Sequence, residues 1–251
     1  MRPAELHFPP NPNFGNGSCV RRISLRSEGS VVQGHLADNF HEMRCVVGHD
    51  TGLVTRITSE AVRIPTTACP AAAGQIQSFT GLPVGTPTRE FYRDGRGRHH
   101  CTHLLDLAVL AIGHAAKPAS TVTYEAVVPD EVDEPVTITI ARNGQLVHRW
   151  LIREGIIVEP AQLSGKTLDK GFASWATIVL DRDALDAATI LARTWLVAIG
   201  RRYLPTLAAG RPALDNPGML GRCYAYSMPH VANAVLTGEP EVLPDQLEDC
   251  P

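Results

Sequence analysis

Two long stretches of alternating apolar and polar residues, each followed by an apolar helical segment, constrain the fold of this chain most strongly. The first stretch runs from residue 19 to 64 and the second from residue 119 to 180. A period of two places successive side chains on opposite faces of a strand, so one face can be buried against a helix. We therefore expect an α+β fold in which antiparallel sheets pack with a few helices.

Turn residues divide the first stretch into short strands. Glu28-Gly29-Ser30 separates the first two strands, and His49-Asp50-Thr51-Gly52 separates the next two. An Asp followed closely by a Gly between two apolar runs is typical of a β-hairpin. The pattern predicts an antiparallel meander of three or four strands within residues 18–64.

Helix start and stop signals follow this meander. The first predicted helix has Thr67 as its N-cap, Pro70 in its first turn and Gly81 at the C′ position. A second helix is predicted from Thr102, again as N-cap, to the residues before Pro118. Its apolar residues occupy more than one face, so we expect it to be buried on most sides.

The second alternating stretch predicts another set of strands and a long helix. The expected strands cover residues 121–128, 136–141, 146–158 and 175–180. Asn143-Gly144 is the strongest hairpin turn in the chain. The helix is predicted from Asp183, as its cap, to Gly200, and the remaining residues contain only short helical pieces.

The length of 251 residues suits one large domain or two small ones. Residues 1–17 are rich in Pro, Asn and Gly and are interpreted as an N-terminal arm. Residues 18–251 are expected to form a single α+β domain, or two β-then-helix halves at 18–118 and 119–251.

Charge and hydropathy exclude several classes of partner. The chain has 23 Lys and Arg against 26 Asp and Glu, a net charge of −3, which argues against a general nucleic-acid binder. Charged residues interrupt its apolar runs well short of the ~20 residues of a membrane span. No glycine-rich nucleotide loop is present, so we expect no cofactor. The expected partner is a small-molecule substrate, and a homo-oligomer is an open alternative.

The cysteines and the first residues indicate a location. The first residues contain no apolar segment typical of a secretory signal. Six dispersed cysteines without a CxxC pair suit the reducing cytoplasm, where we expect the protein.

The densest group of chemistry-bearing residues precedes and opens the second helix. A helix N-terminus attracts anions and disfavours a charged imidazole, so His103 is expected to be a neutral base, oriented by Asp106 one turn later. Tyr92 completes the expected catalytic group as the residue that binds or protonates a substrate oxygen. The expected substrate-binding residues are Arg93, His99, His100 and Cys101. The structural alternative is that Asp106 only complements the helix dipole while His103 is a buried, satisfied polar group.

His41 is a further catalytic candidate, because it can project from a strand into a cavity. A surface strand with alternating polar residues is the alternative. A structural zinc site is also open, with His41, Cys69, Cys101 and His103 as ligands, although the spacing of these residues is unusual for zinc.

The order of several short motifs resembles a bacterial family catalogued as a domain of unknown function. The motifs are Gly34-His35-Leu36-Ala37-Asp38, His41-Glu42-Met43, Cys69-Pro70, Thr80-Gly81-Leu82 and Cys101-Thr102-His103-Leu104. The resemblance covers residues 20–116 and departs at His100, where the family has Gly. It implies that His41, Cys69, Cys101 and His103 belong together, and it associates the chain with the catabolism of aromatic compounds.

Three functions follow as expectations. The first is a cofactor-independent enzyme that acts on a small oxygenated, aromatic, lignin-derived compound by acid/base chemistry, as a carbon–carbon lyase of the retro-aldol, formaldehyde-eliminating type. The second is a protein that binds a small molecule without turning it over. The third is a zinc-binding structural protein.

Overall fold

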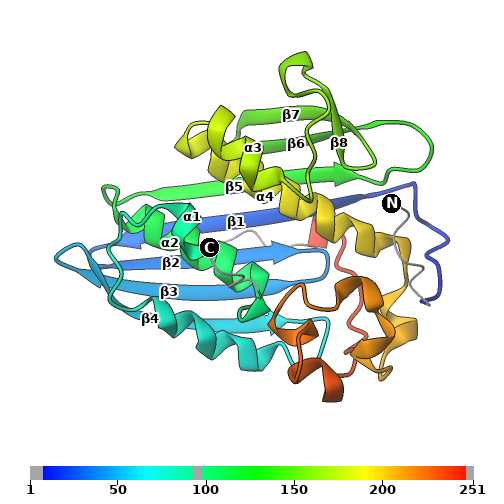
Figure 1. Cartoon of the computed structure of the whole chain (residues 1–251), viewed down its shortest axis with the longest axis horizontal. Helices are drawn as coiled ribbons and strands as arrows, with labels where there is room; N and C mark the ends of the chain where they lie inside the picture. Colours follow the sequence, from blue (N-terminus) through cyan, green and yellow to red (C-terminus); the bar gives the residue numbers. More distant parts are fainter. Residues whose placement is uncertain (1–7, 93–97, 247–251) are drawn as a thin grey trace.

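The computed structural model describes residues 8–92 and 98–246. These residues contain one antiparallel sheet of eight strands in the order β4-β3-β2-β1-β5-β6-β7-β8, with helices packed on it (Figure 1). The strands are β1 (Ser18–Glu28), β2 (Val31–Asp38), β3 (Glu42–Asp50), β4 (Leu53–Arg63), β5 (Thr121–Pro129), β6 (Val136–Arg142), β7 (Gln145–Arg153) and β8 (Ile156–Glu159). The expected α+β class is confirmed.

The helices follow each set of four strands. The first set is followed by the 3-10 helix η1 (Pro70–Phe79), α1 (Thr88–Phe91) and α2 (Thr102–Ala115). The second set is followed by the 3-10 helix η3 (Ala161–Leu163), α3 (Phe172–Val179) and α4 (Arg182–Ala198). Short 3-10 turns from η4 (Ile199–Arg202) to η10 (Pro244–Gln246) make up the C-terminal segment.

Strands β1 and β5 join the two alternating stretches into a single sheet, with Ile23 paired to Tyr124 at the seam. Helix α2 packs over β1, β2 and β3, and α4 packs over β5, β6, β7 and β1 on the same face (Figure 1). One hydrophobic cluster contains buried residues from both helices and from both sets of strands. The two halves therefore share a core within the described residues.

The predicted turns form where glycine permits a left-handed backbone. Thr51 and Gly52 have φ values of 48° and 81°, and Asn143 and Gly144 have values of 50° and 74°, as two-residue hairpin loops require. The turn at Glu154-Gly155 has the same geometry and divides the expected strand 146–158 into β7 and β8.

The expected strand 175–180 is wrong, because these residues belong to α3 and its end. Trp175 is buried against Trp150 and Phe172, and its indole N–H donates to the carbonyl oxygen of Thr167 at 2.9 Å. This burial favours a helix over the strand propensity of the β-branched residues that follow, and Ile178 is left 84% exposed. Tertiary packing thus overrides local propensity here.

The helix caps also differ from the predictions. Cys69, rather than Thr67, is the N-cap of η1, which is a 3-10 helix, and Cys101, rather than Thr102, is the N-cap of α2. In α4 the cap is Asp181, whose side chain accepts from the backbone N of Ala184 at 2.9 Å. Asp183 lies in the first turn, where its carboxylate is free to bind side chains of neighbouring elements.

Gly155 provides a test of this packing. A Cβ atom at Gly155 would lie 2.3 Å from the Trp195 ring, at a φ of +74°. We expect Gly155→Ala to lower the free energy of unfolding by about 2–4 kcal/mol, the sum of backbone strain and the clash. Gly144→Ala is the matched control, because Gly144 has the same φ and nothing within 4 Å of the added atom. Equal losses of unfolding free energy for Gly155→Ala and Gly144→Ala in urea denaturation would show that the Trp195 ring does not pack against Gly155.

The C-terminal segment packs against the connection between β2 and β3. The backbone N of Val242 donates to the carbonyl oxygen of Asn39 at 2.9 Å, and the Asn39 amide donates to Glu241 at 2.7 Å. Arg201 forms a buried ion pair with Asp130 at 2.7 Å. This end of the sheet is therefore held by residues from three parts of the chain.

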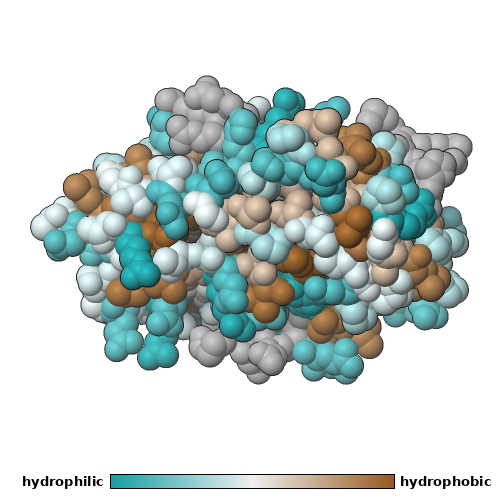
Figure 2. Space-filling view, turned by 90° about the horizontal axis from the view of Figure 1, so that it is seen from below, coloured by the Kyte–Doolittle hydropathy of each residue, from teal (hydrophilic) through white to brown (hydrophobic). Residues whose placement is uncertain are grey.

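Among the described residues, no helix has the length and apolar character needed to cross a membrane. On the face shown in Figure 2, apolar residues occur in small groups separated by polar ones.

Candidate functional site

Asp38 lies at the end of β2, where the chain turns into β3. Its Oδ1 atom accepts hydrogen bonds from the backbone N of Phe40 at 2.9 Å and of His41 at 2.8 Å. Asp side chains commonly bind the backbone two or three residues onward in tight turns. This turn fixes the position of His41 relative to Asp38.

Arg21 and Asp38 form a buried ion pair. The two residues are direct partners across β1 and β2. The guanidinium donates to Asp38 Oδ2 from Nη2 at 2.6 Å and from Nε at 3.1 Å, and the two side chains are 1% and 0% exposed. Burial alone would raise the pKa of Asp38, but His41 and Arg21 outweigh it and hold that pKa well below its usual range. Asp38 is therefore a carboxylate.

The carboxylate fixes the tautomer of His41. His41 Nδ1 lies 3.0 Å from Asp38 Oδ1, and because an ionised carboxylate can only accept, Nδ1 carries the proton. In the neutral ring, the Nε2 atom of His41 then holds a lone pair. A carboxylate that orients an imidazole in this way is the arrangement that general-base histidines use.

His103, in the first turn of α2, stacks on His41 with 3.9 Å between ring centroids and 24° between ring planes. Burial, His41 and Arg21 lower the pKa of His103 well below its usual value, so the ring is neutral at pH 7. Its Nδ1 atom lies 4.0 Å from the sulfur of Cys101. Burial raises the pKa of Cys101 to about 12, so the thiol keeps its proton and can donate it to His103 Nδ1; in that arrangement Nε2 carries the proton of His103.

The two stacked rings thus have opposite tautomers, with a lone pair on Nε2 of His41 and an N–H on Nε2 of His103. Among the described residues, the buried polar side-chain atoms without a partner are Arg142 Nε and Asn216 Oδ1. Because the two Nε2 atoms have no partner there either, both must contact solvent. In these tautomers, the pair offers a base on one ring and a hydrogen-bond donor on the other.

Asp106 is placed differently from the prediction, because its carboxylate binds Tyr92 and Arg193 rather than His103. The Tyr92 hydroxyl donates to Asp106 Oδ1 at 2.5 Å, and Arg193 Nε donates to Oδ2 at 3.1 Å. Burial, and then Asp106, raises the pKa of Tyr92 well above its usual value. Asp38 has the orienting role that was expected of Asp106, but it acts on His41.

Tyr92 and Asp106 line a cavity between α2 and α4. Arg21 also lines it, so one residue both binds Asp38 and borders the cavity. The remaining walls are mainly apolar, with Ile23, Leu36, Val109, Leu110 and Ile190 among them. The cavity has a volume of about 20 Å³, which is room for one or two water molecules, and His41 and His103 are not among its lining residues.

The predicted substrate-binding residues are dispersed. His99 is exposed, and His100 is buried against η1, where its ring stacks on Phe79 at 5.2 Å. Cys101 contacts His103 as described, and Arg93 lies outside the described residues. His100 thus packs on a neighbouring helix instead of bordering the cavity beside Tyr92.

The expected set of His41, Cys69, Cys101 and His103 is not gathered around one point among the described residues: Cys69 is hydrogen-bonded to Thr66 at 3.3 Å and lies near enough to Cys101 to raise the pKa of its thiol. By distance alone, Asp38, His41 and His103 form a possible metal-binding group, with ligand atoms within 4.8 Å of one another. The ring planes argue against it, because lone pairs lie in the plane of each imidazole. The two ring centroids lie 3.9 Å apart and the ring planes are inclined by only 24°. The planes therefore intersect much farther from the ring nitrogens than the ~2.1 Å of a metal–nitrogen bond. Asp38 is also already paired with Arg21.

The fold and site together define an α+β protein with a buried Arg–Asp–His arrangement at one end of its sheet. Residues 24–117 match the family model described as "Protein of unknown function (DUF2889)", which confirms the predicted resemblance to an uncharacterised domain family. The matched segment includes Asp38, His41, Tyr92 and His103, but not α4 with Arg193. No curated protein matches the chain.

The pKa of His103 predicts a pH dependence of stability. The pKa of His103 is lower in the folded protein than the value near 6.5 of an unfolded chain. Above pH 6.5 both states are neutral, so the difference leaves the free energy of unfolding unchanged. As the pH falls below 6.5, the unfolded chain gains a proton that folded His103 does not, so stability is lost. Between pH 7.5 and 5.5 we expect wild type to lose about 1 kcal/mol more than His103→Gln in urea denaturation. Parallel losses would contradict a neutral His103. Asp38 does not interfere, because its lowered pKa places its titration at lower pH.

Proposed function

We propose that this protein is a cofactor-independent enzyme that performs acid/base chemistry on a small oxygenated, aromatic molecule. The observation that carries the proposal is the pair of stacked imidazoles, His41 with a free lone pair and His103 with a free N–H. Asp38 supports it because it fixes the tautomer of His41, and Cys101 supports it because its thiol can donate to Nδ1 of His103. A base beside a neutral donor is suited to removing one proton while stabilising charge on a second oxygen.

The favoured reaction is a carbon–carbon cleavage that releases formaldehyde. His41 takes the proton of a hydroxymethyl group, the carbon–carbon bond breaks, and formaldehyde leaves. The electron pair of that bond forms an alkene and expels a hydroxyl group from the next carbon. The N–H of His103 stabilises the departing oxygen, and the proton held by His41 completes a molecule of water.

The apolar walls of the cavity beside Arg21 and the Tyr92 hydroxyl, held by Asp106, favour an aromatic molecule with an oxygen substituent. The cavity has a volume of about 20 Å³ and is lined by neither His41 nor His103, so the proposal requires its walls to move apart and open towards the two imidazoles when a ring binds. Binding without turnover is the second candidate function, because it requires only the cavity. The proposed location is the cytoplasm, since the described cysteines are free thiols, as a reducing compartment maintains them.

A panel of aromatic 1,3-diols tests the proposal. We expect the purified protein to release formaldehyde from at least one member, in step with an alkene detected by absorbance. Calorimetric binding of a diol without product would establish the binding function instead. Stoichiometric zinc in the purified protein, together with loss of folding on chelation, would support the structural zinc alternative.

A further inference from the structure

Residues 237–243, which we call the C-terminal strap, cross the end of the sheet that carries Asp38 and His41. At the start of the strap, the backbone N of Thr237 donates to the carbonyl oxygen of Pro65 at 3.1 Å, just after β4. Farther along, the side chain of Val242 packs in a small apolar cluster that is separate from the main core. The strap is therefore attached to the sheet at both of its ends.

Between these ends the strap binds Asn39, a fully buried residue that directly follows Asp38. The Asn39 Nδ2 atom donates to the carbonyl oxygen of Ser18 at 3.3 Å and to Glu241 Oε1 at 2.7 Å. Its carbonyl oxygen accepts from the backbone N of Val242 at 2.9 Å. Without the strap, Asn39 would lose the nearer acceptor of its amide and the nearest donor to its carbonyl. Unpaired buried polar groups are costly, so the turn would shift to satisfy them.

Glu241 is held in turn by a buried ion pair. The guanidinium of Arg201 binds the Glu241 carboxylate and also donates to Asp130 at 2.7 and 3.0 Å. The side chains of Arg201 and Asp130 are 6% and 0% exposed. Glu241 thus connects an ion pair in the protein interior to Asn39, in the turn that carries His41.

Strand β4 binds the same turn from another direction. Arg63 Nη2 donates to the carbonyl oxygens of Asp38 at 2.6 Å and of His41 at 3.0 Å. The turn therefore lies between Arg63 and the strap, and the distance of 3.0 Å from His41 Nδ1 to Asp38 Oδ1 depends on the backbone that they hold. A displacement of about 1 Å is enough to impair a catalytic group.

We propose that Glu241 is a positioning residue for His41, because it holds the turn in the geometry in which the Asp38 carboxylate orients the imidazole. The effect on catalysis rests on the proposed function, in which His41 is the base. The effect on the hydrogen bond between Asp38 and His41 is independent of any reaction. Neither Asn39 nor Glu241 lines the cavity beside Arg21, so we expect kcat to change more than KM.

Two substitutions of Glu241 separate its hydrogen bond from its charge. Glu241→Ala removes the oxygen that binds Asn39. Glu241→Gln keeps an oxygen that can accept from Asn39, and Asp130 still neutralises Arg201. On the full chain we would measure the NMR signals of the His41 side chain, the exchange of its Nδ1–H with water, and kcat and KM for formaldehyde release from the diol panel.

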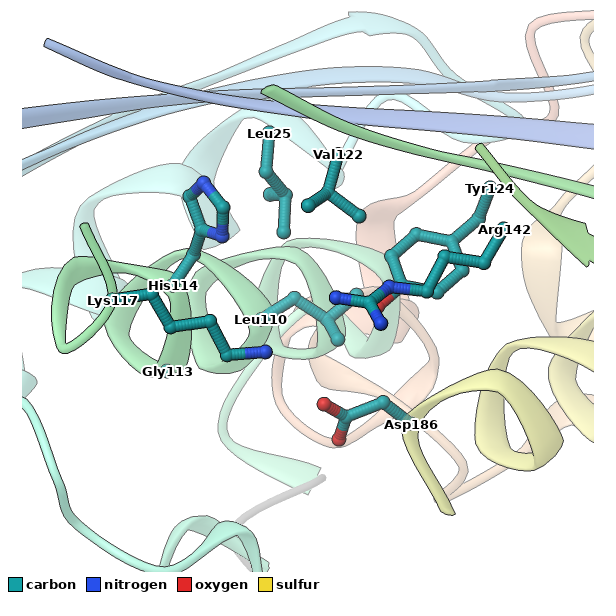
Figure 3. Close-up of a pocket in the computed structure, with 9 residues that line it drawn as sticks. All are labelled: Leu25, Leu110, Gly113, His114, Lys117, Val122, Tyr124, Arg142 and Asp186. Carbon is teal, nitrogen blue, oxygen red and sulfur yellow. The ribbon is translucent and has the colours of Figure 1, made fainter. Parts of the chain in front are cut away.

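Two control variants account for general losses of stability. Glu239→Ala removes a carboxylate from the same strap, at a residue without a hydrogen bond to Asn39 in the described part of the chain. Lys117→Met removes an ion pair with Asp183, whose atoms are 3.1 Å apart. Figure 3 shows Lys117 beside a small cavity at the C-terminal end of α2, whereas the site lies at its N-terminal end.

In Glu241→Ala we expect the His41 Nδ1–H to exchange with water about five- to tenfold faster, as for the loss of one hydrogen bond. The kcat should fall by a similar factor, with KM within about twofold. Glu241→Gln and both controls should match wild type in these measurements. If Glu241→Ala does not fold, Val242→Pro decides by the same measurements, because it removes the N–H that binds the Asn39 carbonyl oxygen.

An unchanged His41 signal in Glu241→Ala would overturn the proposal, as would an equal change in Glu239→Ala or Lys117→Met. So would a Glu241→Gln variant that behaves like Glu241→Ala, because the hydrogen bond to Asn39 would then not be the cause. A changed His41 signal in Glu241→Ala, with no aldehyde released by wild type, would leave the positioning role standing and contradict only the proposed reaction.

Discussion

Replacing Asp38 by Asn is expected to lower the free energy of unfolding by about 3–5 kcal/mol, a large fraction of the stability of an ordinary domain. The amide preserves the shape of the side chain but removes its charge. Arg21, which is 1% exposed, would then be a buried cation without a counter-ion. The loss reflects this unpaired charge more than the intrinsic strength of the ion pair.

Urea denaturation measures this effect, and two further variants make it specific. Asp183→Asn removes a carboxylate that is 49% exposed and paired with Lys117, so we expect a loss of at most about 1 kcal/mol. Removing both charges in Arg21→Met/Asp38→Asn should recover much of the stability, because no charge remains buried and the amide oxygen still accepts from the backbone N–H groups of the turn. A loss below about 1 kcal/mol for Asp38→Asn would show that Arg21 reaches solvent.

The largest expected effect on activity is that of His41→Gln. The glutamine amide can still donate to Asp38, so the fold should be preserved, but it provides no basic lone pair. General-base catalysis typically contributes 10²–10⁴-fold, and we expect kcat for formaldehyde release to fall by about that factor.

His35→Gln is the matched control for this variant. His35 and Asp38 point to opposite faces of β2, and His35 contacts Glu42 at 3.2 Å. Replacing His35 should therefore leave kcat within about twofold. Equal activity of His41→Gln and wild type would exclude His41 as the base. Equal losses in both variants would point to a general defect of the sheet instead of a chemical role.

Much of the fold is predictable from local signals. Strand alternation and the turns at Thr51-Gly52 and Asn143-Gly144 locate most strands, because a left-handed turn between apolar runs admits few alternatives. The pairing of β1 with β5 is not predictable in this way, because it depends on contacts between distant residues. The same is true of α3, where burial of Trp175 overrides strand propensity.

The site is predictable only in part, for a similar reason. His41 and His103 are prominent in the sequence, and their motifs indicate that they belong together. Their partners are less visible: Asp38 precedes His41 by three residues, a spacing that signals a tight turn, but Arg21 and Arg193 come from other elements. The role predicted for Asp106 is wrong. Helical spacing places it near His103, but its two oxygens bind Tyr92 and Arg193, which come from other parts of the chain. Oligomeric state and substrate stay predictions.

¹⁵N NMR of the histidine side chains distinguishes opposite tautomers of His41 and His103 from a metal site that the two rings share. With both rings neutral, we expect a protonated Nδ1 and a bare Nε2 for His41, and a bare Nδ1 and a protonated Nε2 for His103. His103 should keep this pattern at pH 6. Identical tautomers, a protonated His103 at pH 7, or both rings shifting together on addition of one equivalent of Zn²⁺ would contradict these assignments.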